Sequence, residues 1–323
     1  MKKALVFGGG GFIGSHLVTR LVKEGFWVRA VDVKLPEFSE SRADDFIIGD
    51  LRDVNVSKSA LDTNFDEIYQ LAADMGGTGF IGTGDNDADI LHNSATINLN
   101  VLNSCEATKQ TGNIFYSSSA CVYPERNQMD PNNPNCEEST TYPANPDTEY
   151  GWEKLFSERL YLTYRANKGL KTFVARYHNI FGPDGTWNGG REKVPAAICR
   201  KVAHANDGES VEIWGDGEQT RSFLYIEHCL EGTTRLIRSN FFGPVNIGSD
   251  RLISINSLVD MVVKISKKTL GKNYIDGPQG VRGRVSDNKL ILQKLKWSPS
   301  SELQEGLTHT YNWISSQINK DRL

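Results

Sequence analysis

Short apolar runs alternate with helical stretches along the first half of the chain. Residues 3–7 form an apolar run that ends in glycines, residues 15–23 carry apolar positions at helical spacing, and residues 28–32 form a second apolar run. A strand, a glycine turn, a helix and a second strand together make a βαβ unit. Further strands are expected at 45–48, 67–71, 113–117 and 172–176. This alternation predicts an α/β fold with a doubly wound parallel sheet and helices on both of its faces.

The pattern changes after about residue 180. Glycines at 182, 185, 189 and 190 mark long turns, so a second, irregular region is expected to begin there. Residues 124–148 are rich in Pro, Asn, Asp and Glu and predict a surface loop, whereas 303–318 has the spacing of a helix. We therefore expect a first domain of residues 1–178, to which 222–250 returns, and a smaller C-terminal domain of 179–221 and 251–323.

Composition narrows the class of protein. The 323 residues are 38% hydrophobic and carry a net charge of −4, which argues against a nucleic-acid partner because phosphate backbones favour a basic surface. No apolar run reaches the length of a membrane span, and the four apolar residues that follow Lys3 are too few for a signal peptide. We expect a cytoplasmic protein. Its five cysteines form no C-x-x-C pair, so neither a disulfide framework nor a metal site is expected.

The first glycine turn has the pattern of a dinucleotide-binding fingerprint. Gly8, Gly11 and Gly14 lie between the first strand and the first helix, where they permit a tight turn and a close approach of the pyrophosphate to the backbone. The start of the helix supplies amides and the positive end of its dipole. Asp32, 18 residues after Gly14, suits the ribose hydroxyls and would repel a 2′-phosphate, which favours NAD over NADP. The remaining residues expected to contact NAD in this Rossmann-type domain are Phe12, Ile13, Asp50, Leu51, Tyr150 and Lys154, with Asp50 a candidate for the adenine.

A serine, a tyrosine and a lysine predict the chemistry. Ser119 follows a strand, and Tyr150 and Lys154 lie four residues apart on one face of the next helix. A free tyrosine has a pKa of ~10, too high for a base at neutral pH. A nearby ammonium and the positive nicotinamide are expected to lower it. Tyr150 would then take a proton from a sugar hydroxyl as hydride leaves for NAD, with Ser119 bonded to the same oxygen.

This combination resembles the extended short-chain dehydrogenase/reductase superfamily, whose members act mainly on nucleotide sugars. Oxidation at sugar C4 acidifies the hydrogens on C3 and C5, so further acid/base groups decide the product. In that superfamily, dehydratases carry an Asp-Glu pair after the serine and plain 4-epimerases carry small residues. Here Ser119 is followed by Ala120 and Cys121. Strand alternation is expected to turn Cys121 to the same face as Ser119.

Cys121 and Lys193 can serve as two acid/base groups. A thiol with a reference pKa of ~8.5 exchanges protons near neutrality, particularly beside a cation. Lys193 lies in a glycine-rich loop of the second region. Inversion at carbon requires one group to remove a proton and another to return one on the opposite face. A packed strand thiol and an ordinary surface lysine are the alternatives for these two residues.

Six segments, in order, are similar to the GDP-mannose 3,5-epimerase family. They are 71–77, 118–121, 176–180, 189–193, 214–223 and 280–284. The resemblance implies that Cys121 and Lys193 are the epimerising pair and that the chain forms a homodimer. It also implies sugar-nucleotide contacts from Gly76, Asn179, Glu192, Lys193, Lys201, Gln219, Arg221 and Arg284, of which Arg284 suits a pyrophosphate. The chain departs from the plant enzymes in a longer, more acidic 82–89 stretch, which we expect near the substrate, and in Trp152.

The resulting hypothesis is an NAD-dependent isomerase. It would oxidise C4 of GDP-mannose, exchange protons at C5 and C3 through enolates, and reduce C4 again to give GDP-L-galactose; whether C3 inverts together with C5 is left open by the sequence. The alternative is another NAD-dependent nucleotide-sugar epimerase or a 4-keto-sugar reductase. A non-catalytic NAD-binding scaffold is the third possibility, although such a protein would not need both Tyr150 and Lys154.

Overall fold

A seven-stranded parallel sheet forms the centre of the computed structural model, which describes residues 1–278, 280–300 and 303–321. The order of its strands is β11-β6-β5-β4-β1-β2-β3. Their bounds are β1 Lys3–Phe7, β2 Trp27–Asp32, β3 Asp45–Ile48, β4 Glu67–Gln70, β5 Asn113–Ser119, β6 Lys171–Tyr177 and β11 Val245–Ile247. The order reverses direction at β1, so the carboxyl ends of β1 and β4 lie at the switch point where ligands bind in such sheets.

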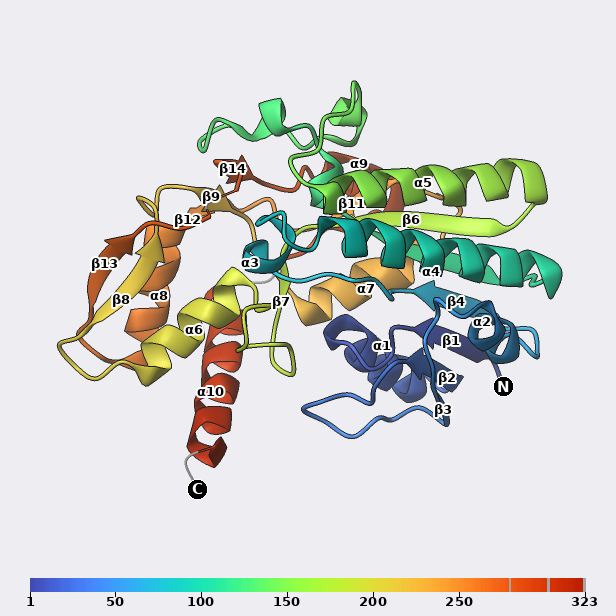
Figure 1. The fold of residues 1–323 in the computed structure, drawn as a ribbon, viewed down its shortest axis with the longest axis horizontal. Helices are drawn as coiled ribbons and strands as arrows, with labels where there is room; N and C mark the ends of the chain where they lie inside the picture. The colour runs from blue at the N-terminus through green and yellow to red at the C-terminus, as the bar shows by residue number, and fades with distance from the viewer. Residues whose placement is uncertain (279, 301–302, 322–323) are drawn as a thin grey trace.

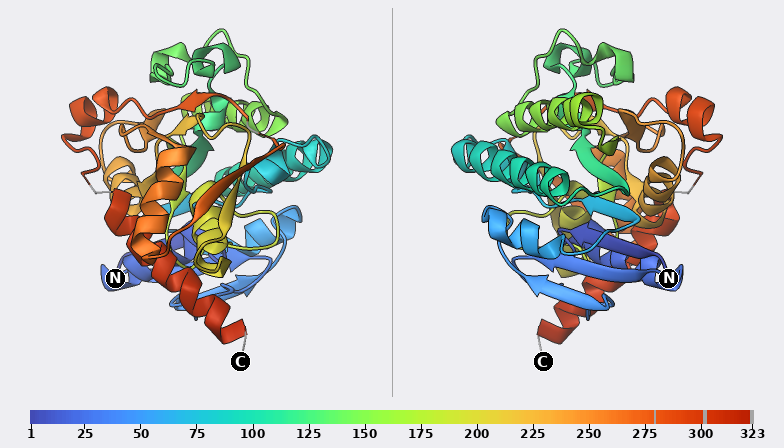
Figure 2. Two further views of the ribbon diagram at one scale, coloured as in Figure 1. Left: turned by 90° about the vertical axis from the view of Figure 1, so that its left-hand side faces the viewer. Right: turned by 90° about the vertical axis from the view of Figure 1, so that its right-hand side faces the viewer.

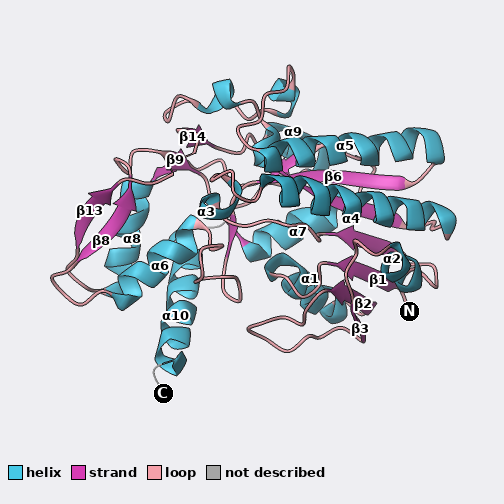
Figure 3. Ribbon diagram, in the orientation of Figure 1, coloured by secondary structure: helices cyan, strands magenta, loops and turns pink. Residues whose placement is uncertain are grey.

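Helices cover both faces of this sheet (Figures 1 and 3). One face carries α2 (Val54–Ala60), α4 (Asp87–Ala107) and α5 (Glu149–Lys168), and the other carries α1 (Phe12–Lys23) and α7 (Ile226–Ile237). Along β1, Leu5 and Phe7 enter the core beneath α4 and α5, whereas Ala4 and Val6 enter the core beneath α1 and α7. Both sets are fully buried, which explains why β1 is a continuous apolar run. The predicted fold class is confirmed.

The second region lies beside the carboxyl ends of the strands (Figure 1; the left panel of Figure 2 faces it). Its own core lies among α6 (Val194–His204), α8 (Ile255–Ser266) and α10 (Leu303–Asp321), where Trp187, Ile198, Leu258 and Ile314 are buried. Its strands are β7 Ile180–Phe181, β8 Ser210–Trp214, β9 Thr220–Arg221, β10 Leu224–Tyr225, β12 Ile253–Ser254, β13 Gly271–Ile275 and β14 Gly283–Arg284. They pair as β10-β7, β12-β9-β14 and β13-β8.

Two segments differ from the expected organisation. The 124–148 segment, expected as a surface loop, contains short 3-10 turns and buries Gln128, Cys136 and Thr141. Helix α9 (Lys289–Leu295) packs against β11, and its Ile291 joins the core beneath the sheet. The expected division into domains stays a prediction, and α9 is the part of 251–323 that packs against the sheet. No helix among the described residues is long and apolar enough to cross a bilayer.

Candidate active site

The glycine turn after β1 has the geometry of a phosphate-binding site. Gly8 has φ +83°, and a Cβ added at Gly14 would lie 2.0 Å from the Gly8 carbonyl oxygen, so helix α1 packs directly on the turn. Gly11 is the N-cap of α1, and no side chain caps this end of the helix. The amides at the start of α1 are therefore available to a phosphate group. These residues fit the pyrophosphate of NAD.

Asp32 and Asp50 have different surroundings at the carboxyl ends of β2 and β3. Asp32 ends β2, and its Oδ2 accepts a hydrogen bond from the Gly10 amide at 2.9 Å. Burial raises the pKa of Asp32, and the bond from Gly10 opposes that shift. The carboxylate retains acceptor sites that suit ribose hydroxyls. Asp50 instead accepts the Arg52 guanidinium at 2.6 Å, which lowers the pKa of Asp50. The contact of Asp50 with adenine remains a prediction. The contact of the buried Leu51 with NAD also remains a prediction.

Ser119, Tyr150 and Lys154 come together at the end of β5. Helix α5 begins because the Thr148 side chain accepts the Gly151 amide, which sets Tyr150 and Lys154 on its inner face. Lys154 Nζ donates to the Ser117 carbonyl at 3.0 Å and lies 5.7 Å from the centre of the Tyr150 ring. Tyr150 and Lys154 are both buried.

Burial is the largest influence on the electrostatics of this centre. Burial raises the pKa of Tyr150, with Cys121 and Glu153 adding to the rise, while a hydrogen bond with Ser119 opposes it. Burial also lowers the pKa of Lys154. The predicted lowering of the tyrosine pKa requires both the Lys154 ammonium and the positive nicotinamide, so for the NAD-bound enzyme it stays a prediction. In the chain without NAD, desolvation of the phenolate is the largest influence on Tyr150, and Lys154 directs its hydrogen bond to the Ser117 carbonyl.

Cys121 reaches the centre through a turn rather than along a strand. Strand β5 ends at Ser119, and residues Ala120–Val122 form a 3-10 turn in which Ser119 Oγ accepts the Cys121 amide at 3.2 Å. The alternation argument for Cys121 was therefore wrong, although Ser119 and Cys121 each contact Tyr150. Cys121 packs with Tyr150 and Ile90, with Phe80 against them.

Arg284 lies against the sulfur of Cys121. Its Nη1 is 3.1 Å from Cys121 Sγ, its Nε donates to Gln128 Oε1, and its Nη2 donates to Asp147 Oδ1 at 3.2 Å. Burial disfavours the guanidinium charge, but Cys121 and Asp147 outweigh it and raise the pKa of Arg284. Sequence reasoning missed Gln128 and Asp147, because both lie in the 124–148 segment. The order Asp147, Thr148, Glu149 at the start of a helix was the available signal.

Lys193 belongs to the same cluster. It is the N-cap of α6, and Ala197 N donates to its carbonyl at 3.0 Å. Burial lowers the pKa of Lys193, and Cys121 is the largest opposing influence. A lysine with a lowered pKa accepts protons more readily near neutrality. Lys193 and Cys121, 72 positions apart in the sequence, therefore lie close enough for their charges to interact.

The other predicted substrate residues have mixed surroundings. Gln219 is buried, and its Oε1 has no partner in the described part of the chain, so this acceptor suits a ligand donor. Arg221 lies close enough to Arg284 that burial and this second charge lower the pKa of Arg221 to about 10. Glu192 instead accepts the Arg200 guanidinium at 2.8 Å. Lys201 donates to the Glu212 carbonyl, Asn179 donates to the Ser222 carbonyl, and Gly76 is buried beneath Phe80.

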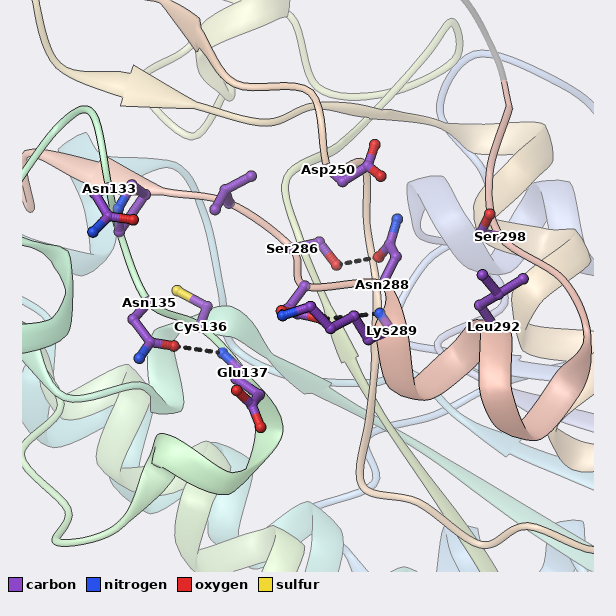
Figure 4. A pocket seen from close by; sticks show the side chains of 13 residues that line it. Asn133, Asn135, Cys136, Glu137, Asp250, Ser286, Asn288, Lys289, Leu292 and Ser298 are labelled. Atoms are coloured by element: carbon purple, nitrogen blue, oxygen red, sulfur yellow. Dashed lines mark hydrogen bonds and ion pairs between the residues drawn. The ribbon is translucent and has the colours of Figure 1, made fainter.

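A polar cavity of about 550 Å³ lies next to this centre without including it (Figure 4). It opens between the 133–137 and 285–289 segments, and none of the predicted site residues lines it. Its lining residues are Asn133, Pro134, Asn135, Cys136, Glu137, Asp250, Val285, Ser286, Asp287, Asn288, Lys289, Leu292 and Ser298. The candidate active site is therefore defined by contacts around Cys121 rather than by this cavity.

A dinucleotide turn, a buried tyrosine–lysine pair and an acid/base cluster beside it define an NAD-dependent enzyme that acts on a hydroxyl and an adjacent carbon. The model of the NAD dependent epimerase/dehydratase family matches residues 4–248. The chain is 45% identical to a GDP-mannose 3,5-epimerase of Arabidopsis thaliana over 99% of this chain and 84% of that protein. It is 44% identical to GDP-mannose 3,5-epimerase 1 of Oryza sativa subsp. indica over 98% and 82%.

Among solved structures, a UDP-glucuronic acid 4-epimerase from Bacillus cereus, in complex with UDP-glucuronic acid and NAD, has a TM-score of 0.82. The two are 26% identical, and the match covers 98% of this chain and 99% of that one. The chain belongs to the GDP-mannose 3,5-epimerase family within the NAD-dependent epimerases and dehydratases. The predicted family, the isomerase class and the NAD cofactor are confirmed.

The two departures from the plant enzymes lie outside the catalytic cluster. Trp152 is 40% exposed on the outer side of α5. Residues 83–85 of the acidic stretch are exposed, and Asn86 in the middle of the stretch donates to the Phe80 carbonyl at 3.1 Å. The stretch therefore contacts Phe80, and Phe80 in turn packs against Cys121 and Tyr150.

Proposed function

We propose that this protein converts GDP-mannose to GDP-L-galactose by transient oxidation at C4, proton exchange at C5 and C3, and reduction at C4. The observation that carries this proposal is the placement of Cys121 Sγ against Arg284, beside Tyr150 and within reach of the Lys193 charge. A plain 4-epimerase or a 4-keto-sugar reductase would not need this second acid/base cluster.

Tyr150 and Ser119 hold the C4 oxygen in this mechanism. Tyr150 takes the hydroxyl proton, and Ser119 donates a hydrogen bond to the same oxygen as the carbonyl forms. Bound NAD would supply the hydride acceptor and donor for C4, and its positive charge would oppose the burial that raises the pKa of Tyr150. Residues proposed to hold NAD are Gly8, Gly11, Phe12, Ile13, Gly14, Asp32, Asp50, Leu51, Tyr150 and Lys154.

Cys121 and Lys193 then exchange protons at the carbon next to the ketone. One removes the proton to give an enolate, and the other delivers a proton to the opposite face. The Arg284 guanidinium remains hydrogen-bonded to the sulfur while it carries negative charge. The sugar nucleotide is proposed to contact Gly76, Asn179, Glu192, Lys193, Lys201, Gln219, Arg221 and Arg284.

The proposal extends to domains, assembly and compartment. Residues 1–178, 222–250 and helix α9 would bind NAD, and 179–221 with the rest of 251–323 would bind the sugar nucleotide. The homodimer would use the outer sides of α4 and α5, where Leu99, Trp152 and Phe156 are 37%, 40% and 47% exposed. All five cysteines are free thiols, in keeping with a reducing cytoplasm.

Incubation with GDP-mannose in D₂O tests the function. We expect deuterium at C5, and at C3 where that carbon also inverts, with NMR of the product showing the altered configuration. Cys121→Ala should abolish the label while bound NADH still forms, whereas Tyr150→Phe should abolish both. Normal C4 chemistry without solvent label would instead indicate a 4-epimerase or a reductase. Bound NAD with no reaction on any sugar nucleotide would indicate a scaffold protein.

A further inference from the structure

Two loops from different parts of the chain meet over the candidate site. Residues 74–81, which include the short helix α3 (Thr78–Ile81), come from the end of β4, and residues 189–193 come from the second region. The Gly77 amide donates to the Arg191 carbonyl at 3.0 Å. A Cβ added at Gly77 would lie 2.3 Å from the Glu192 carbonyl oxygen. The two loops are therefore in direct backbone contact.

The Arg191 side chain, from one of these loops, also contacts two residues of the other. Its guanidinium lies 3.8 Å from the centre of the Phe80 ring, and its Nη1 is 3.4 Å from Asp74 Oδ1. The side chain is 52% exposed, so neither contact requires Arg191 to enter the core. A stacked guanidinium with one carboxylate partner is a specific arrangement that lysine cannot reproduce, since only the planar group stacks on a ring.

The contact between Arg191 and Phe80 lies between the two acid/base groups, Cys121 and Lys193. Phe80 packs against Cys121 and Tyr150. On the other side, Lys193 follows Arg191 by two residues and begins α6 as its N-cap. Arg191 thus stacks on Phe80, which packs against Cys121, and lies in the same loop as Lys193.

We propose that Arg191 is a positioning residue that fixes Lys193 relative to Cys121, so that proton exchange depends on it and C4 oxidation does not. This inference rests on the function proposed above. Inversion requires Lys193 and Cys121 to face the same carbon, and a displacement of about 1 Å in such an arrangement can lower the rate ~100-fold. Tyr150, Lys154 and Ser119 are held by β5 and α5, outside the two loops.

Arg191→Ala and Arg191→Lys test this role, with Arg235→Ala as the matched control. Arg235 also pairs with a carboxylate, Glu231, at 2.5 Å and lies over a ring, 5.9 Å from the centre of Trp297, but on α7. Two rates are measured with GDP-mannose: deuterium uptake at C5 by NMR, and formation of bound NADH by stopped-flow absorbance. Thermal unfolding of each holoenzyme reports whether the fold is intact.

We expect Arg191→Ala to lower deuterium uptake at least ~10-fold while NADH formation stays within ~2-fold of the wild type, because only the exchange step loses its geometry. Deuterium uptake by Arg191→Lys should lie between that of Arg191→Ala and that of the wild type, and Arg235→Ala should match the wild type in both rates. An equal fall in both rates, or unchanged deuterium uptake, would overturn the assignment. Absence of C5 label in the wild type would refute the proposed function instead.

Discussion

Replacement of Arg284 gives the sharpest test of how Cys121 works. Its guanidinium meets Cys121 Sγ, Gln128 Oε1 and Asp147 Oδ1, three acceptors that a single ammonium cannot reach together. Arg284→Lys therefore keeps the charge but loses the geometry, and Arg284→Gln loses both. Arg282→Gln is the control, because Arg282 lies two residues away and pairs at 2.9 Å with the exposed Asp216.

The size of the effect follows from the bond to sulfur. A hydrogen bond to a charged group contributes about 1.5–3 kcal/mol. At ~1.4 kcal/mol for each tenfold change in rate, its loss should slow the steps in which Cys121 carries negative charge by ~10–150-fold. Loss of the partner of Asp147, a carboxylate with 13% of its side chain exposed, should also lower the free energy of unfolding. Rates are therefore measured below the unfolding transition of each variant.

Solvent exchange and substrate affinity distinguish the two roles of Arg284. If its bond to Cys121 matters, deuterium uptake at C5 falls with little change in KM and with NADH formation retained. A rise in KM with exchange unchanged at saturation would refute this reasoning and assign Arg284 to the pyrophosphate, as the family resemblance implies. Arg282→Gln should leave both quantities near the wild-type values.

Three further predictions concern stability, assembly and the cofactor. His178 is buried and its pKa is lowered to about 3 from 6.5, so the unfolded chain binds a proton that the folded chain does not as pH falls below 6.5; urea unfolding should show a loss of about 2 kcal/mol from pH 8 to 5, and His178→Asn should lack this contribution. Trp152→Glu and Phe156→Glu should shift sedimentation from dimer to monomer at micromolar concentration, and a wild-type monomer would contradict the proposed interface. Asp32→Asn should retain less NAD through gel filtration, since hydrogen bonds to a charged acceptor are lost; unchanged retention would show that Asp32 does not hold the ribose.

The sheet and the dinucleotide turn could be predicted because local pattern determines them. The apolar run of β1 is matched by burial from Ala4 to Phe7, and the predicted span 3–7 is the observed strand. The cap at Thr148 likewise follows from the residues at the start of α5. In these elements the hydrophobic period and the capping residue agree with the final packing.

The acid/base cluster could be predicted only in part because long-range contacts build it. Arg284 meets Cys121 across 163 positions, and no local pattern in the glycine-rich segment around Arg284 indicates that partner. Gln128 was hidden in a polar segment whose composition resembles an exposed loop, yet it is fully buried. The burial that raises the pKa of Tyr150 in the chain without NAD could not be predicted either, because it depends on the completed fold.

The turn that carries Cys121 separates backbone geometry from side-chain chemistry. Ser119 Oγ accepts a hydrogen bond from the Cys121 amide. A Cβ added at Gly151 would lie 2.2 Å from the Cys121 carbonyl oxygen, so neighbouring residues contact both backbone groups of Cys121. Neither constraint involves the sulfur. Position 121 can therefore change chemistry without moving the tyrosine or the serine. Over evolution, one substitution there would suffice to remove proton exchange from a scaffold that still oxidises C4, whereas a gain of proton exchange would also require Lys193.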